Sequence, residues 1–444
     1  MRRLPLHLLD EILFNLDPKS LGKMRCTNKS INTHISDDPN FKFEYFSRIG
    51  SSLLHISKVG SKFLCFYPYA ISRLFKNRTP LKNLCNILGS CSGLVLLSIN
   101  GILCVANPLT KKFRFLHYSI WGNETWIGFA VDQIDRATQR FKIVFISEQL
   151  EVSNPYETTY QFRINTGESW SLSKTTITCR VSNLKKGKNS KPVYVNGDLH
   201  WLRKDGSIVA FNPETEKARL IQSQFNRKPG KLLLCTGDNR LTLISATDAV
   251  ISVYALETDG QWILVRWIKN EVVHQSLPLL YWNVQAYDGK CLLVRMMSLV
   301  GSVIHRYDLR ANKWRVLGSI PTWCDADRDF FLFKPSWSSV IGLLDQEHVH
   351  VLMPMPMPMP MPMPMPMPMP MHMPMHMPMP MAMPMPMPMP MAMAMPMPMP
   401  MAMPMPMPMP MPMTKTETET VTRSEVISSV MAIMGLVNRT LSFI

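Results

Sequence analysis

The chain has 444 residues, a formal net charge of +16 and a hydrophobic fraction of 46%. This length predicts about two or three domains with a sizeable core, and the positive charge favours an acidic partner, although it also serves solubility. The nine cysteines are scattered and include no C-x-x-C pair, which excludes a zinc ribbon and a redox motif and indicates a reducing compartment.

The first residues predict an amphipathic helix. Leu9, Ile12, Leu13 and Leu16 recur at the i, i+3, i+4, i+7 spacing of one helix face. A signal peptide would show a continuous apolar core instead. We therefore expect a location in the nucleus and/or cytoplasm, and no membrane association.

Two more short helices are expected before residue 46. Asp17 followed by Pro18 is typical of an N-cap and a first helical residue, so a second helix is expected to begin there. A third helix around Ile31 and Ile35 is expected to end before Pro39, because a residue that precedes proline avoids the helical region. Three short helices bury little core, so their spare apolar face is expected to dock either on the rest of the chain or on a partner protein.

The pattern Leu-Pro, Glu-Ile-Leu and Lys-Ser-Leu within residues 4–21 resembles the F-box. In that family the module docks a protein on a Skp-family adaptor, and through it on the cullin scaffold of a ubiquitin ligase. The resemblance covers roughly residues 2–46. It implies that the spare apolar face meets a partner protein and that the chain selects targets for ubiquitination.

The resemblance also implies which residues bind the adaptor. In the family, the Leu-Pro pair and the apolar face of the first two helices make the contact. The matching positions are Leu4, Pro5, Leu8, Ile12, Leu13, Leu16 and Leu21. Ile31 stands where the family usually has a tryptophan, and there is an extra aspartate at residues 37–38. The third helix therefore departs from the family pattern.

Residues 47–84 are expected to be a linker, and residues 85–350 change to strand-like runs separated by turns. One unit recurs: an apolar strand, a polar turn, and a strand with a bulky apolar residue. The first turn residues of its five copies are Asn107, Asn165, Asn212, Glu257 and Asp308. A period of about 50 residues, with about four strands each, is typical of a kelch-like propeller blade.

The predicted fold class is therefore multidomain: an α-helical F-box at 1–46, then an all-β, kelch-like propeller of five or six blades, then a disordered low-complexity tail. Four tryptophans of this segment are expected to pack between blades rather than bind a ligand. They are Trp170, Trp201, Trp262 and Trp314. Residues 89–97, 106–110 and 127–132 also make this segment resemble the F-box-associated domain of plant F-box proteins.

A dense basic run, Lys185–Lys191, is expected to be a solvated loop. It contains no aromatic residue that could stack on bases, so nucleic acid is the less favoured partner.

Residues 353–413 alternate Met with Pro, interrupted mainly by His and Ala. Proline at every second position forbids a helix and removes half the donors of a strand, so this low-complexity run is expected to be extended or disordered. Its alternation resembles the translation of an expanded six-base DNA repeat. A Cu(I) site of methionines with His372 and His376 is a less favoured alternative. Residues 414–444 are expected to be a disordered tail or a short helix.

The leading functional hypothesis is a non-catalytic substrate receptor of a Skp-cullin-F-box ubiquitin ligase, with an unknown protein target. No catalytic residue, cofactor or metal site is predicted, because the propeller histidines are isolated and no Gly-rich phosphate loop occurs. The alternatives are a basic propeller that binds sugar or nucleic acid without a ligase role, and a degenerate family member.

Overall fold

The fold is that of a computed structural model. The structure describes residues 4–16, 18–48, 51–56, 63–66, 85–99, 101–116, 126–135, 138–150, 156–180, 182–185, 191–222, 231–274, 281–298, 301–320, 330–343, 427–428, 430–431 and 434. All the described residues belong to one compact unit. The Met-Pro run, on which the prediction of disorder and the copper alternative rest, lies outside the described residues.

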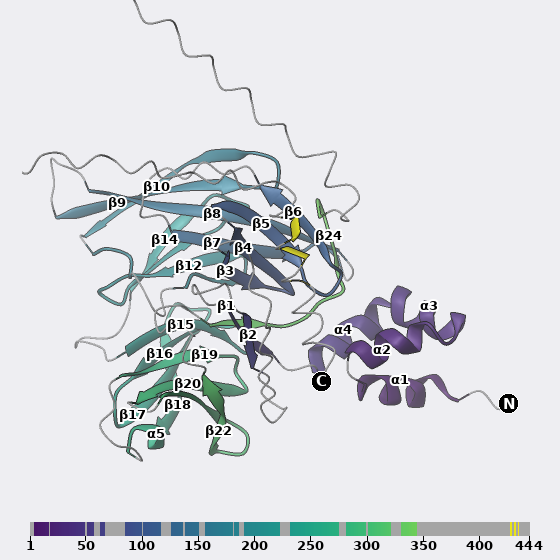
Figure 1. The fold of residues 1–444 in the computed structure, drawn as a ribbon. Coiled ribbons are helices and arrows are strands. Elements are labelled where there is room, and N and C mark those ends of the chain that lie inside the picture. Colours follow the sequence, from purple (N-terminus) through teal and green to yellow (C-terminus); the bar gives the residue numbers. More distant parts are fainter. Residues whose placement is uncertain are drawn as a thin grey trace, which may run out of the picture. The chain divides into compact units, whose positions relative to one another are not determined.

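Four helices open the chain (Figure 1): α1 (Leu6–Phe14), α2 (Pro18–Arg25), α3 (Lys29–Asp37) and α4 (Pro39–Arg48). The predicted start of the second helix at Pro18 and the predicted end of the third before Pro39 are both confirmed. Asp17 lies outside the described residues. The four helices share a core of five buried side chains: Leu13, Leu21, Ile35, Phe41 and Tyr45.

The fourth helix was not predicted, because Pro39 was interpreted only as a stop signal. Asp38 does end α3, because its backbone is extended (ψ 107°). Its Oδ1 then accepts hydrogen bonds from the backbone N–H groups of Asn40 (2.8 Å) and Phe41 (3.2 Å). Proline is well tolerated as a first helical residue, where no intrahelical donor is needed. The same Asp-Pro pair therefore ends α3 and starts α4.

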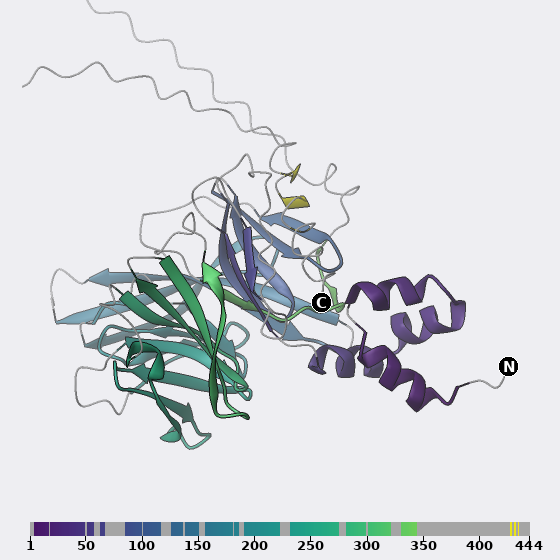
Figure 2. The same cartoon turned by 60° about the horizontal axis from the view of Figure 1, so that its bottom comes forward.

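Five antiparallel blades of four strands follow in chain order, and Figures 1 and 2 show the strands of each sheet side by side. Blade 1 is β3 (Cys85–Cys91), β4 (Leu94–Ile99), β5 (Ile102–Asn107) and β6 (Lys112–Leu116). Blade 2 is β7 (Trp126–Gln133), β8 (Thr138–Leu150), β9 (Glu157–Asn165) and β10 (Trp170–Arg180). Blade 3 is β11 (Val193–Val195), β12 (Asp198–Leu202), β13 (Ile208–Phe211) and β14 (Ala218–Ile221).

Blade 4 is β15 (Lys231–Gly237), β16 (Arg240–Ala246), β17 (Val250–Leu256) and β18 (Trp262–Lys269), followed by the short helix α5 (Glu271–His274). Blade 5 is β19 (Tyr281–Tyr287), β20 (Cys291–Ser298), β21 (Gly301–Asp308) and β22 (Lys313–Ile320). The last strand, β24 (Ser339–Val340), joins blade 2 by pairing in parallel with β8.

A sixth sheet closes the ring. It contains β1 (Ser52–Ile56), β2 (Phe63–Phe66) and β23 (Phe331–Phe333), with β1 in the middle. Its Leu53 packs on blade 5, whereas Leu54 packs on blade 1. Strands from ahead of the first blade and from after the fifth therefore join the two ends of the propeller. This corrects the predicted linker at 47–84, because β1 and β2 lie within it and pair with each other, and β1 also pairs with β23.

The five predicted repeat copies are confirmed as the connections between the third and fourth strands of the blades. In these turns Asn107 and Asn212 accept hydrogen bonds from backbone N–H groups two and three residues ahead, and Asp308 does the same. Asn and Asp favour turns for this reason. The fourth-blade copy uses Asp259 in this role, whose Oδ1 accepts from Gln261 N (3.0 Å).

The four tryptophans lie between blades, as predicted. Trp201 and Trp262 are buried in the clusters that join blade 2 to blade 3 and blade 3 to blade 4. Trp170 packs against Phe145 at 4.7 Å between ring centroids in the cluster of blades 1 and 2, and Trp314 packs on the cluster of blades 4 and 5.

Two further findings concern the described residues as a set. None of their helices is long and apolar enough to cross a membrane. At the end of the chain, residues 427–428, 430–431 and 434 are helical, which agrees with the short helix expected as one of two alternatives for the tail.

Candidate functional site

Helix α1 has an apolar face that points away from its own bundle. Leu4, Leu8 and Ile12 are 50%, 45% and 52% exposed, and Pro5 is also exposed. Leu4, Leu8 and Ile12 are four residues apart, so their side chains follow one side of the helix and of the residues leading into it. We call Leu4, Pro5, Leu8 and Ile12 the α1 strip.

The other three predicted adaptor-binding residues lie elsewhere. Leu13 and Leu21 are completely buried in the core of the helical bundle, and Leu16 is half-buried against it. The prediction that Leu13 and Leu21 contact a partner directly therefore needs correction, because their side chains are already enclosed by Ile35, Phe41 and Tyr45. They support the α1 strip from below.

Polar contacts fix α1 against the other helices. Asp10 Oδ1 lies 2.5 Å from His34 Nε2 of α3, and Arg48 Nη2 of α4 lies 3.2 Å from Glu11 Oε1. Hydrogen bonds to Glu11 and then Glu44 raise the pKa of the Arg48 guanidinium, so it keeps its charge. The guanidinium carbon also lies 4.2 Å from the centre of the Phe14 ring. These contacts hold α1 in one orientation, so the α1 strip is presented as a rigid surface.

The third helix contributes Ile31 to the side of the helical bundle. Ile31 is half-buried and packs on the bundle core rather than projecting freely. The bundle also touches the residues that follow β23. Tyr45 stacks on Trp337 with 6.0 Å between ring centroids, and the Arg25 guanidinium carbon lies 5.6 Å from the same ring.

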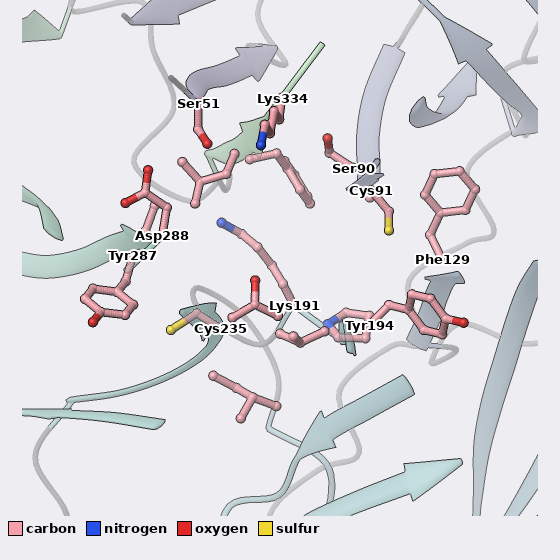
Figure 3. A pocket seen from close by; sticks show the side chains of 18 of the residues that line it. Ser51, Ser90, Cys91, Phe129, Lys191, Tyr194, Cys235, Tyr287, Asp288 and Lys334 are labelled. Carbon is pink, nitrogen blue, oxygen red and sulfur yellow. The ribbon is translucent and has the colours of Figure 1, made fainter. Parts of the chain in front are cut away.

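A second candidate site is a cavity of about 680 Å³ lined by all six sheets of the propeller (Figure 3). Each sheet contributes from its strand nearest the cavity. The lining includes Cys91 of β3, Phe129 of β7, Tyr194 of β11, Cys235 of β15, Tyr287 of β19 and Phe331 of β23. The cavity therefore lies along the central channel of the ring, where residues distant in sequence converge.

Three lysines line this cavity, Lys191, Lys290 and Lys334, together with Asp238 and Asp288. Figure 3 shows the side chains of Lys191 and Lys334 reaching toward its middle. Lys191 Nζ donates a hydrogen bond to the Phe330 carbonyl oxygen. Partial burial, and then the charge of Lys290, lower the pKa of Lys334.

The predicted solvated loop at Lys185–Lys191 is wrong at both ends. Burial lowers the pKa of Lys185 to about 8, and its Nζ donates to the Leu232 carbonyl oxygen at 2.7 Å. Lys191 lies over the ring of Phe331, 4.8 Å from its centre. The sequence carried no local signal for this, because both lysines find their partners on strands or loops far along the chain. Residues 186–190 lie outside the described residues.

Burial favours the neutral forms of two cysteines that line the cavity and of one histidine in the propeller core. Burial raises the pKa of the Cys91 thiol to about 11 and also raises the pKa of Cys235, so both stay protonated at neutral pH. Burial lowers the pKa of His200 to about 4 within the propeller core. In the described part of the chain, no group of three or more His, Cys, Asp or Glu side chains could hold a metal ion.

Comparison with known proteins agrees with this geometry. Residues 1–43 match the F-box domain, and residues 71–283 match the F-box associated beta propeller domain. The chain is 97% identical over 444 residues to an F-box/kelch-repeat protein of Arabidopsis thaliana, with all of both chains covered. It is 50% identical over 369 residues to a second F-box protein of that plant, covering 77% of this chain and 86% of the relative.

These matches show a protein that joins an F-box to a β-propeller. The chain belongs to the family of plant F-box proteins with an F-box-associated propeller domain. Members of this family are generally non-catalytic substrate receptors of ubiquitin ligases, and F-box domains generally bind Skp1-family adaptors within cullin ligases. Among solved structures, a nidogen/laminin complex is 12% identical with a TM-score of 0.35, covering 63% of this chain and 96% of that chain.

Proposed function

We propose that this protein is the substrate-recognition subunit of a Skp-cullin-F-box ubiquitin ligase, acting in the nucleus and/or cytoplasm. In this proposal the α1 strip binds a Skp-family adaptor and the propeller binds a protein target. The observation that carries it is the exposed apolar surface of α1, which belongs to a domain of the F-box family and lies opposite a helix face that is already buried.

The physical argument rests on the difference between the two faces of α1. Leu13 is fully buried by its own bundle, whereas Leu8 and Ile12 remain about half exposed. A partner that removes exposed leucine and isoleucine side chains from water stabilises the complex by roughly 25 cal/mol for each Å² of apolar surface buried. A rigid strip also loses little conformational freedom on binding, which favours a specific partner.

The experiment compares Leu8→Asp with a matched control, Leu6→Asp, in the full-length protein. Leu6 lies on the same helix and is 58% exposed, but it lies off the α1 strip. Both variants are tested in pull-downs with a panel of Skp-family adaptors. Leu8→Asp should lose binding and Leu6→Asp should retain it. Equal binding by both variants would show that the α1 strip is not the contact.

A second candidate function, anion binding by the propeller without a ligase role, is favoured by the lysines at the central cavity. Its test is the binding of poly-glutamate by the full-length protein over a range of salt concentrations. Affinity should fall with salt and should weaken in Lys334→Gln, whereas Lys313→Gln, a control on the exposed strand β22, should leave it unchanged. A flat salt response would eliminate this function.

A further inference from the structure

Blade 1 has two apolar faces, and they are covered differently. Along β4, side chains alternate between the two faces, as in any strand. Leu94 and Leu96 face blade 2 and share a cluster with Phe129 and Ile143. Val95, Leu97 and Ile99 face the opposite way, toward the side of the ring that the sixth sheet closes. That second face is continued by Cys104, Ala106 and Phe113 of β5 and β6.

The sixth sheet is too small to cover this second face alone. Blade 1 has four strands, whereas the closing sheet has three, of which β23 spans only Phe331–Phe333. Among the described residues, its buried contributions to the cluster are Leu54 and Phe333. Apolar side chains of β5 and β6 on this face would therefore remain uncovered if nothing else packed there.

The end of the chain packs there. Ile427 is 5% exposed, and Val430 and Met434 are completely buried, in the same cluster as the second face of blade 1. Met431 packs partly against it, whereas Ser428 is exposed. Residues 427, 430, 431 and 434 share one face of a helix, because they follow the i, i+3, i+4, i+7 spacing. Figure 1 draws these residues in yellow beside β6.

The connection to the propeller is long, and the ring is closed without this segment. Residues 344–426 of the sequence separate it from the last described residue of the propeller, and its described residues belong to the same unit as the propeller. Ring closure depends on the antiparallel pairing of β1 with β23, in which Leu53 lies opposite Leu332. The C-terminal segment can therefore leave its place while the ring remains closed.

We propose that the helical residues 427, 428, 430, 431 and 434 are a latch, and that the surface they cover, between blade 1 and the sixth sheet, is a binding groove for an amphipathic helix. The groove is occupied in cis by the latch and can be vacated. The occupant it fits presents Ile, Val and Met at the latch spacing. This inference concerns the propeller alone and does not depend on adaptor binding.

The first test uses a fluorescent peptide with the sequence of residues 424–438 as the probe. A tethered segment holds its own site at an effective concentration of up to about millimolar, so the wild-type protein should bind the peptide weakly. In full-length Val430→Asp, the latch carries a charge at a buried position and should leave the groove. Its affinity for the peptide should then rise at least about tenfold.

The matched control is full-length Ser428→Asp, which puts the same charge at the exposed side of the latch and should bind like the wild type. A peptide that itself carries the Val430→Asp change should bind neither protein. Equal peptide binding by the wild type and Val430→Asp, or binding by neither, would overturn the proposal.

Hydrogen exchange provides a second measurement, which does not depend on a peptide probe. The backbone amides of residues 430, 431 and 434 should exchange slowly in the wild type and rapidly in Val430→Asp. Adaptor binding should be the same in both proteins, which separates this proposal from the ligase function. Rapid exchange at these positions in the wild type would contradict the latch.

Discussion

The neighbouring residues Ile12 and Leu13 should have opposite roles, and single alanine substitutions separate them. Leu13 is completely buried, whereas Ile12 is 52% exposed on the α1 strip. Leu13→Ala leaves a cavity in a small core and should lower the free energy of unfolding of the helical bundle by about 2–5 kcal/mol. Ile12→Ala should change it by no more than about 0.5 kcal/mol.

Ile12→Ala should instead weaken the binding of the adaptor. Its exposed half becomes buried by an adaptor, so its loss should cost about 1–1.5 kcal/mol of binding free energy, or roughly a tenfold rise in Kd. Local stability is measured from hydrogen exchange of the α1 amides, and affinity by calorimetric titration with a Skp-family adaptor. An Ile12→Ala protein with faster α1 exchange and unchanged affinity would refute this assignment of the two faces.

Three other predictions concern the propeller. Burial lowers the pKa of His200 to about 4, whereas an unfolded histidine titrates near pH ~6.5, so between these values only the unfolded chain binds the extra proton. The free energy of unfolding should therefore be largest above pH ~6.5 and should fall by up to ~3 kcal/mol as the pH drops to about 4. His200→Asn should flatten this fall in denaturation curves recorded over the same pH range. Asn212→Ala removes the acceptor of two turn hydrogen bonds and should lower the free energy of unfolding by about 1–2 kcal/mol in urea titrations. Met434→Ala should weaken the packing of the latch on the propeller by about 2 kcal/mol or more, whereas Met431→Ala, at a half-buried position, should cost less; equal increases in the amide exchange of the latch in the two variants would contradict this packing.

The repeat of the propeller could be predicted because its signal is local. A turn such as the one at Asn212 is set by one side chain and the backbone two and three residues ahead, so the sequence itself carries the information. The helical bundle was predictable for the same reason up to Pro39. The fourth helix was missed because Asp38 both ends α3 and caps the start of α4.

The closing sheet could not be predicted in the same way. Leu53 pairs with Leu332 at the other end of the propeller, and no local pattern links them. The faces of α1 show a related limit: periodicity identified Ile12 and Leu13 as apolar helix positions but could not determine which one the bundle would bury. Lys191 was taken as solvated because its partner, the Phe330 carbonyl, is equally distant in sequence.

The central claim is that the α1 strip joins this protein to a ubiquitin ligase. The most direct measurement is the affinity of the full-length protein for each Skp-family adaptor, compared with a Leu4→Ala, Pro5→Ala variant. We predict binding to at least one adaptor by the wild type and its loss in the variant. No binding to any adaptor, or undiminished binding by the variant, would contradict the account.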